Sequence, residues 1–91
     1  MAKYLIEVPH EVTQKKCQEA IQIFLSTGSH FLSQADWGCL DGIHKAWITV
    51  EVENKEEALG ILPPAYRDLA TVVCLCKFSL DEDNALIADH E

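Results

Sequence analysis

The stretch from Phe31 to Val52, FLSQADWG-CLDG-IHKAWITVEV, decides how the fold of this chain is predicted. Over residues 44–52 apolar and polar side chains alternate, so one face of the segment carries His44, Ala46, Ile48, Val50 and Val52. A period of two residues is typical of a half-buried strand. Asp41-Gly42, between two strand-forming runs, is a strong signal for a β-hairpin. The sequence therefore predicts a hairpin around this turn.

Four further elements flank the hairpin. Residues 3–8 alternate like a strand, and Pro9 ends it because proline cannot donate to a strand ladder. Apolar residues at helical spacing predict a helix from about residue 11 or 13 to residue 27, followed by Gly28 as a left-handed cap. Asn54 is a good N-cap for a second helix, residues 55 to about 62, which ends at Pro63-Pro64. Residues 70–78 form the last predicted strand.

This order predicts an α+β, ferredoxin-like βαββαβ fold, with a four-stranded antiparallel sheet and two helices on one face. Strands one and three are expected at the centre. The predicted helix-facing side chains are Tyr4, Ile6, Val8, Ala46, Ile48, Val50, Val52, Val72, Cys74 and Cys76. The predicted open face carries Leu5, Glu7, Trp47, Thr49, Glu51, Val73, Leu75 and Lys77. Large apolar side chains on an uncovered face favour an interface, so we expect a homodimer through it.

Charge and composition exclude several function classes. The chain has 91 residues and a formal charge of −8, with five acidic residues in an acidic C-terminal tail, 81–91, after a single domain, 1–80. No basic stripe is present for nucleic acid, and no apolar run is long enough for a membrane span. Without a signal-peptide pattern at the start, we expect a cytoplasmic protein. All four cysteines are expected to remain thiols.

The element order, the length and the semi-apolar open face, over about residues 3–78, resemble the stand-alone dimeric α+β barrel domains. In that superfamily two ferredoxin-like sheets pack open face to open face. Its members include haem-degrading monooxygenases, quinone-forming monooxygenases, small isomerases and amino-acid-binding regulators. The resemblance implies a homodimer with a cleft between the two sheets. It supplies no functional residues, because no subfamily's set matches this chain.

The candidate site follows from the hairpin register. A two-residue turn between Leu40 and Ile43 would place Asp36 opposite Trp47. Two carboxylates on a semi-apolar face could act as acid and base, and we predict Glu7 and Asp36 as catalytic residues. The predicted ligand-binding residues are Gln34, Trp47, Thr49, Glu51 and Lys77. The alternative interpretation makes these side chains the polar rim of a dimer interface.

No metal site is predicted, because the chain has no C-x-x-C or H-x-x-x-H spacing. His10 and His30 are expected at the opposite end of the sheet from His44. Cys39 and His44 are expected opposite each other beside the turn, close enough to share an ion, but they are interpreted as ordinary turn-flanking residues. No cofactor is predicted, although haem ligation by one of the three histidines stays open.

The sequence thus predicts a homodimeric small-molecule-binding protein or small enzyme that uses a cleft between two sheets. One alternative is a protein-interaction or regulatory module without catalytic activity. The other is a haem-degrading-type monooxygenase.

Overall fold

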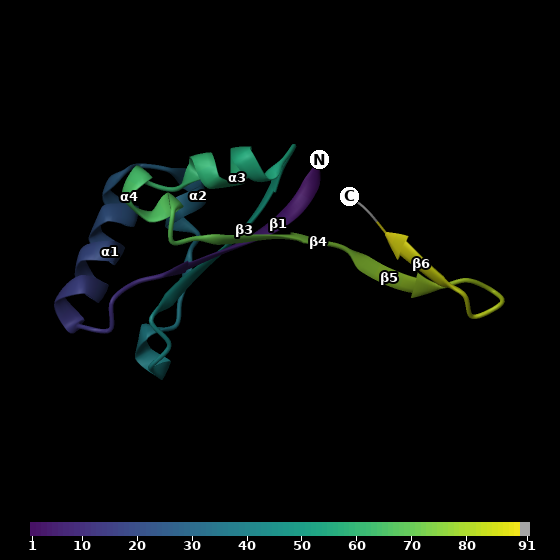
Figure 1. Ribbon diagram of the computed structural model, residues 1–91, viewed down its shortest axis with the longest axis horizontal. Helices are drawn as coiled ribbons and strands as arrows, with labels where there is room; N and C mark the ends of the chain where they lie inside the picture. The colour runs from purple at the N-terminus through teal and green to yellow at the C-terminus, as the bar shows by residue number, and fades with distance from the viewer. Residues whose placement is uncertain (90–91) are drawn as a thin grey trace.

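A four-stranded antiparallel sheet forms the body of the protein in the computed structural model, which describes residues 1–89, with Asp89 as backbone only (Figure 1). Its strands are β1 (Ala2–Pro9), β2 (Asp36–Trp37), β3 (Lys45–Val52) and β4 (Thr71–Leu75), in the order β2-β3-β1-β4. As predicted, β1 and β3 occupy the centre. They are antiparallel, in a register that runs from Ala2–Val52 to Pro9–Lys45.

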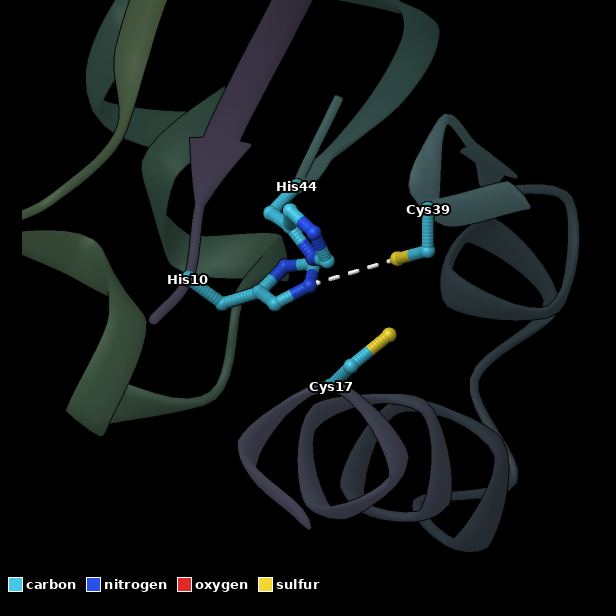
Figure 2. A group of neighbouring side chains, drawn as sticks. All are labelled: His10, Cys17, Cys39 and His44. Atoms are coloured by element: carbon cyan, nitrogen blue, oxygen red, sulfur yellow. Dashed lines mark hydrogen bonds between the residues drawn. The ribbon is translucent and has the colours of Figure 1, made fainter. Parts of the chain in front are cut away.

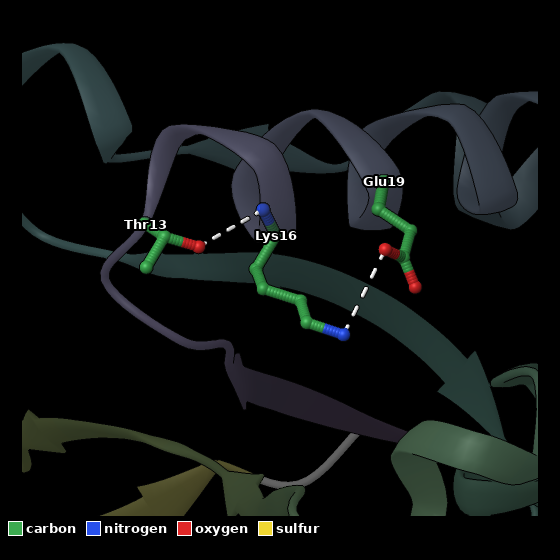
Figure 3. Close-up of polar contacts among 3 residues, drawn as sticks. All are labelled: Thr13, Lys16 and Glu19. Carbon is green, nitrogen blue, oxygen red and sulfur yellow. Dashed lines mark hydrogen bonds and ion pairs between the residues drawn. The ribbon is translucent and has the colours of Figure 1, made fainter.

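The two longer helices begin close to the predicted positions, and Asn54 is the N-cap that the sequence indicated. The Oγ1 atom of Thr13 accepts a hydrogen bond from the Lys16 backbone N–H and opens α1 (Gln14–Ser26), where Lys16 also pairs with Glu19 at 3.8 Å (Figure 3). Gly28, with φ of +75°, follows the helix in the left-handed region. Asn54 accepts from the Glu57 N–H and opens α3 (Lys55–Ile61). The short α4 (Pro64–Arg67) follows the predicted proline break.

The α-helices lie on one side of the sheet, and the core fills the space between (Figure 1). The predicted inward face of the two central strands is confirmed, since Tyr4, Ile6, Val8, Ala46, Ile48 and Val50 are buried. Phe24 and Leu62 cover them from the helices. Cys74 and Cys76, however, are exposed, and their prediction as core residues is wrong. They lie at the end of the edge strand β4 and just beyond it, so fewer elements cover them.

The first run of the predicted hairpin is a helix rather than a strand. Ser29 caps α2 (His30–Ser33) by accepting from the Leu32 N–H, and this helix buries Leu32. Only Asp36 and Trp37 remain extended, as β2, and they pair with Trp47 and Ala46 in the predicted register. The turn is also longer than two residues. It contains the 3₁₀ helix η1 (Cys39–Asp41), followed by Gly42 at φ of +80°.

The last predicted strand divides at Cys76. β4 stays in the main sheet, whereas β5 (Lys77–Leu80) leaves it and pairs with β6 (Leu86–Asp89) in a separate two-stranded sheet. Residues 77–89, which we call the arm, extend away from the body (Figure 1). The molecule is therefore elongated, at 54 × 27 × 20 Å. His90 and Glu91, the end of the predicted acidic tail, lie outside the described residues.

The predicted ferredoxin-like βαββαβ fold, and the dimeric α+β barrel that it implied, are therefore wrong. Over residues 1–89 the chain is an α+β protein with six strands in two antiparallel sheets and four helices, of which only α1 and α3 reach seven residues. Local capping at Ser29 and the departure of the chain at Cys76 explain the difference. None of the helices described has the length and apolar character needed to span a membrane.

Candidate metal centre

Two histidines meet where the central strands pair. His10 directly follows β1, and His44 directly precedes β3. Because antiparallel strands bring the end of one beside the start of the other, the His10 N–H donates to the His44 carbonyl at 3.1 Å. The prediction that His10 lies at the opposite end of the sheet from His44 is wrong for this reason.

Two cysteines reach the same place from other elements. Cys17 lies in the first turn of α1, on the side that faces the core, and is buried. Cys39 is the first residue of η1. The turn that carries Cys39 is held by Gly38, whose N–H donates to the Lys45 carbonyl and whose carbonyl accepts from the Ile43 N–H, both at 3.0 Å.

The side chains of His10, Cys17, Cys39 and His44, which we call the cluster, converge (Figure 2). One potential ligand atom from each of the four residues lies within 4.8 Å of the other three. Within the cluster, Cys39 Sγ forms a hydrogen-bond contact with His10 Nε2 at 3.3 Å. The two imidazole rings pack edge to face, with centroids 5.5 Å apart. Four soft or borderline donors thus surround one point.

Burial favours the uncharged forms of two cluster residues, His10 and Cys39. It lowers the pKa of His10, and the neighbouring His44 lowers it further. Burial also raises the pKa of the Cys39 thiol to about 11, with a smaller contribution from its hydrogen bond with Cys17. A neutral imidazole is ready to coordinate a metal, whereas a thiol must first lose its proton.

One buried nitrogen of the cluster lacks a hydrogen-bond partner. Among the described residues nothing bonds to Nδ1 of His44, although the atom is shielded from solvent. Leaving such a group unsatisfied costs about 1–3 kcal/mol. Coordination of a metal through Nδ1 would give this atom the partner that it lacks. An unpaired buried nitrogen beside two thiols is therefore a second feature that points to a ligand here.

Aromatic packing fixes one side of the cluster, and a cavity lies on another. The Trp37 ring lies 5.8 Å from the His10 ring and 5.0 Å from the Phe24 ring, between centroids. A mostly apolar cavity of about 590 Å³ opens beside Cys17, Cys39 and His44. Its other lining residues are Val12, Gln14, Gln18, Ile21, Trp37 and Leu40.

The predicted catalytic residues lie elsewhere, on the uncovered face of the sheet. Asp36 pairs with Trp47, and Trp47 pairs with Glu7, so the three residues form one cross-strand row. The Trp47 Nε1–H donates to Glu7 Oε1 at 3.1 Å, and Lys45 Nζ lies 3.6 Å from the same carboxylate. Glu7 is thus partnered by its own chain, and Asp36 is exposed. Their catalytic role stays a prediction.

The structure does not bring all the predicted ligand-binding residues together. Thr49 and Glu51 are exposed further along β3, opposite Leu5 and Lys3. Gln34 is the exposed C-cap of α2, so it does not pair with Thr49 as the hairpin register predicted. Lys77 belongs to the arm, in the other sheet.

Comparison with family models, curated proteins and solved structures gave no match for this chain. The cluster must therefore be interpreted from its chemistry. Sequence reasoning missed the cluster, although one signal was present. The antiparallel pairing of strands one and three was predicted correctly, and this pairing already places His10 beside His44. Cys17 is one of the apolar residues whose helical spacing predicted the helix that contains it.

Proposed function

We propose that this chain is a metal-binding protein that holds one zinc ion between His10, Cys17, Cys39 and His44. The observation that carries the proposal is the convergence of two thiols and two imidazoles within 4.8 Å. Zinc prefers tetrahedral sulfur and nitrogen ligands, and two cysteines with two histidines are one of its common structural sets. Magnesium and calcium prefer oxygen donors, so this set disfavours them.

The distances support such a site after small side-chain movements. With Zn–S bonds of about 2.3 Å and Zn–N bonds of about 2.0 Å, tetrahedral ligand atoms lie about 3.3–3.8 Å apart. The 3.3 Å between Cys39 Sγ and His10 Nε2 already lies at the lower end of this range. The widest separation, within 4.8 Å, requires a contraction of about 1 Å. Rotation about side-chain bonds is sufficient for that movement.

Four protein ligands leave no open coordination position, which favours a structural rather than a hydrolytic role. The ion would join the end of β1, the first turn of α1, η1 and the start of β3. Because it would bind the folded chain only, it would stabilise that chain by about 2.7 kcal/mol at a free concentration 100-fold above Kd. The result is a metal-dependent clamp on one end of the sheet.

Cobalt substitution tests the proposal directly. Metal-free protein should bind one Co²⁺ with the intense visible bands of a tetrahedral site and a near-ultraviolet thiolate-to-cobalt band, and Zn²⁺ should displace it. Cys39→Ser and His44→Gln should each weaken binding by at least about 100-fold, because each removes a ligand.

Matched controls come from the same chain. Cys74→Ser and His30→Gln change a cysteine and a histidine outside the cluster, and both variants should bind Co²⁺ like the unmodified protein. Weak octahedral cobalt spectra without a thiolate band would refute the proposal. Loss of binding on Cys74→Ser, with retention on Cys39→Ser, would move the site to the exposed cysteines.

The cavity beside the cluster favours a second candidate function, the binding of a small apolar molecule. Its volume of about 590 Å³ lies within the 300–1,000 Å³ typical of ligand sites. A hydrophobic fluorescent dye should quench Trp37 in a Trp47→Phe variant, and Ile21→Asp should abolish the effect. Equal dye binding by Ile21→Asp would contradict this assignment. Self-association through the open sheet face and a cytoplasmic location stay predictions.

A further inference from the structure

The arm presents a continuous apolar face to solvent. In the β5–β6 register Phe78 pairs with Ala88 and Leu80 pairs with Leu86, so all four side chains share one face. Phe78 is 65% exposed, Leu80 61% and Leu86 73%. The other face carries Lys77, Ser79 and Ile87. A two-stranded hairpin is marginally stable by itself in water, so this face needs a surface to cover it.

The turn of the arm is nevertheless well formed. The Asp81 Oδ1 atom accepts from the N–H groups of Asp83 and Ala85, at 2.8 and 2.9 Å. The Asp81 N–H donates to the Ala85 carbonyl at 2.9 Å, and Asn84 adopts φ of +64°, which asparagine tolerates. The turn of the arm is therefore preformed, which reduces the ordering that docking requires.

We propose that the arm of each chain docks its apolar face, Phe78, Leu80, Leu86 and Ala88, onto the uncovered sheet face of a second copy. Leu5 and Val73 are cross-strand neighbours on that sheet face, and Leu75 follows two residues along β4. Within the described chain the α-helices lie on the other side of the sheet (Figure 1). The arm leaves directly from the end of β4, so a two-fold axis near Cys76 lets both arms dock reciprocally and closes the assembly.

The area that can be buried argues for a reciprocal partner. Covering a large apolar side chain removes roughly 100 Å² from water, so the three large side chains of one arm bury roughly 300 Å². With the receiving surface, one docked arm accounts for about 600 Å², which is typical of a non-specific contact. Two reciprocal arms reach about 1,200 Å², the lower bound of specific interfaces. In a dimer of two copies each chain contributes one arm, so the buried area doubles. An unrelated partner would receive only one arm.

Sedimentation of the full chain tests the assembly, with adjacent residues as matched variants. The unmodified protein, at 10.2 kDa per chain, should sediment as two chains at micromolar concentration. Leu86→Glu places a carboxylate on the docking face and should weaken dimerisation on the order of 100-fold. Ile87→Glu, on the other face of the same strand, should leave the dimer intact. A monomeric unmodified chain, or equal effects of the two variants, would overturn the proposal.

A mixing experiment tests the arm-to-face geometry itself. Val73→Lys changes the receiving face and should also give monomers. When Leu86→Glu and Val73→Lys chains are mixed, one unaltered arm meets one unaltered face. In the second contact the introduced carboxylate of one chain meets the introduced ammonium of the other, so both contacts are retained and heterodimers should form. Circular dichroism and unfolding midpoints should show both variants folded, since both positions are exposed. Absence of heterodimers from these two folded variants would refute arm exchange.

Discussion

Replacing Gly38 by alanine tests whether close packing of the turn holds Cys39 in the cluster. A Cβ atom on residue 38 would lie 2.7 Å from the Ile43 carbonyl oxygen and 2.9 Å from the Trp47 ring. The carbonyl cannot move freely, because it also accepts from the Lys45 N–H at 2.9 Å. Overpacking of this kind costs about 1–3 kcal/mol. For a domain of this size, 1 kcal/mol corresponds to about 4–8 °C in Tm.

We therefore expect Gly38→Ala to lower the free energy of unfolding by about 1–3 kcal/mol, measured by urea denaturation of the metal-free protein. It should also weaken Co²⁺ binding, since the strain moves the turn that carries Cys39. Gly60→Ala is the control, because nothing lies within 4 Å of its Cβ position and residue 60 lies within α3. That change should stabilise by about 0.5–1 kcal/mol. A Gly38→Ala protein as stable as the unmodified one would refute the packing argument.

Three further outcomes are expected. Phe24→Ala should destabilise by about 3–5 kcal/mol in urea, because Phe24 is 1% exposed and fills the core; a loss below 1 kcal/mol would contradict this. Burial raises the pKa of both tyrosines, Tyr4 and Tyr66. Their contribution to stability is therefore present below pH about 10 and is lost as the pH rises through the raised pKa values. Phenolate absorbance should appear at a higher pH in folded than in urea-unfolded protein. In the folded chain a thiol reagent should modify the exposed Cys74 and Cys76 quickly and the two cluster cysteines slowly; four equal rates would contradict the described burial.

The sequence predicted the central strand pair and the two longer helices because local signals and long-range packing agree there. Ile6 and Ile48 lie on the buried faces of two strands in which apolar and polar side chains alternate. Thr13 and Asn54 lie at the two helix starts. The α2 segment was missed because its apolar spacing fits a short strand as well as a helical turn. The hydrogen bond from the Leu32 N–H to the Ser29 side chain caps the segment and favours the helical turn.

The split of the last strand could not be read from β-propensity, since residues 71–80 favour strand throughout. What changes at Cys76 is the pairing partner, β1 before it and β6 after it. The apolar tail residues Leu86 and Ile87 were visible in the sequence. Their pairing with β5 depends on the Asp81–Asn84 turn, whose local hydrogen bonds were not anticipated.

The cluster was missed for a different reason. No two of its residues have the short spacing of a familiar metal motif, and the strand ends that join them were assigned to opposite ends of the sheet. Correct use of the antiparallel register would have placed His10 beside His44. The predicted turn already placed Cys39 opposite His44, but the pair was interpreted as ordinary residues beside the turn, although the actual turn is longer than two residues.

The separation of the cluster along the chain has a kinetic consequence. His10 and Cys39 are 29 residues apart, and they meet only after β1 has paired with β3. A metal ion that needs all four ligands therefore binds only after this pairing, and we expect the complete site to form after the transition state of folding. Interactions absent from the transition state slow unfolding and leave the folding rate almost unchanged. Zinc at this position would thus lengthen the lifetime of the native state without helping the chain to reach it.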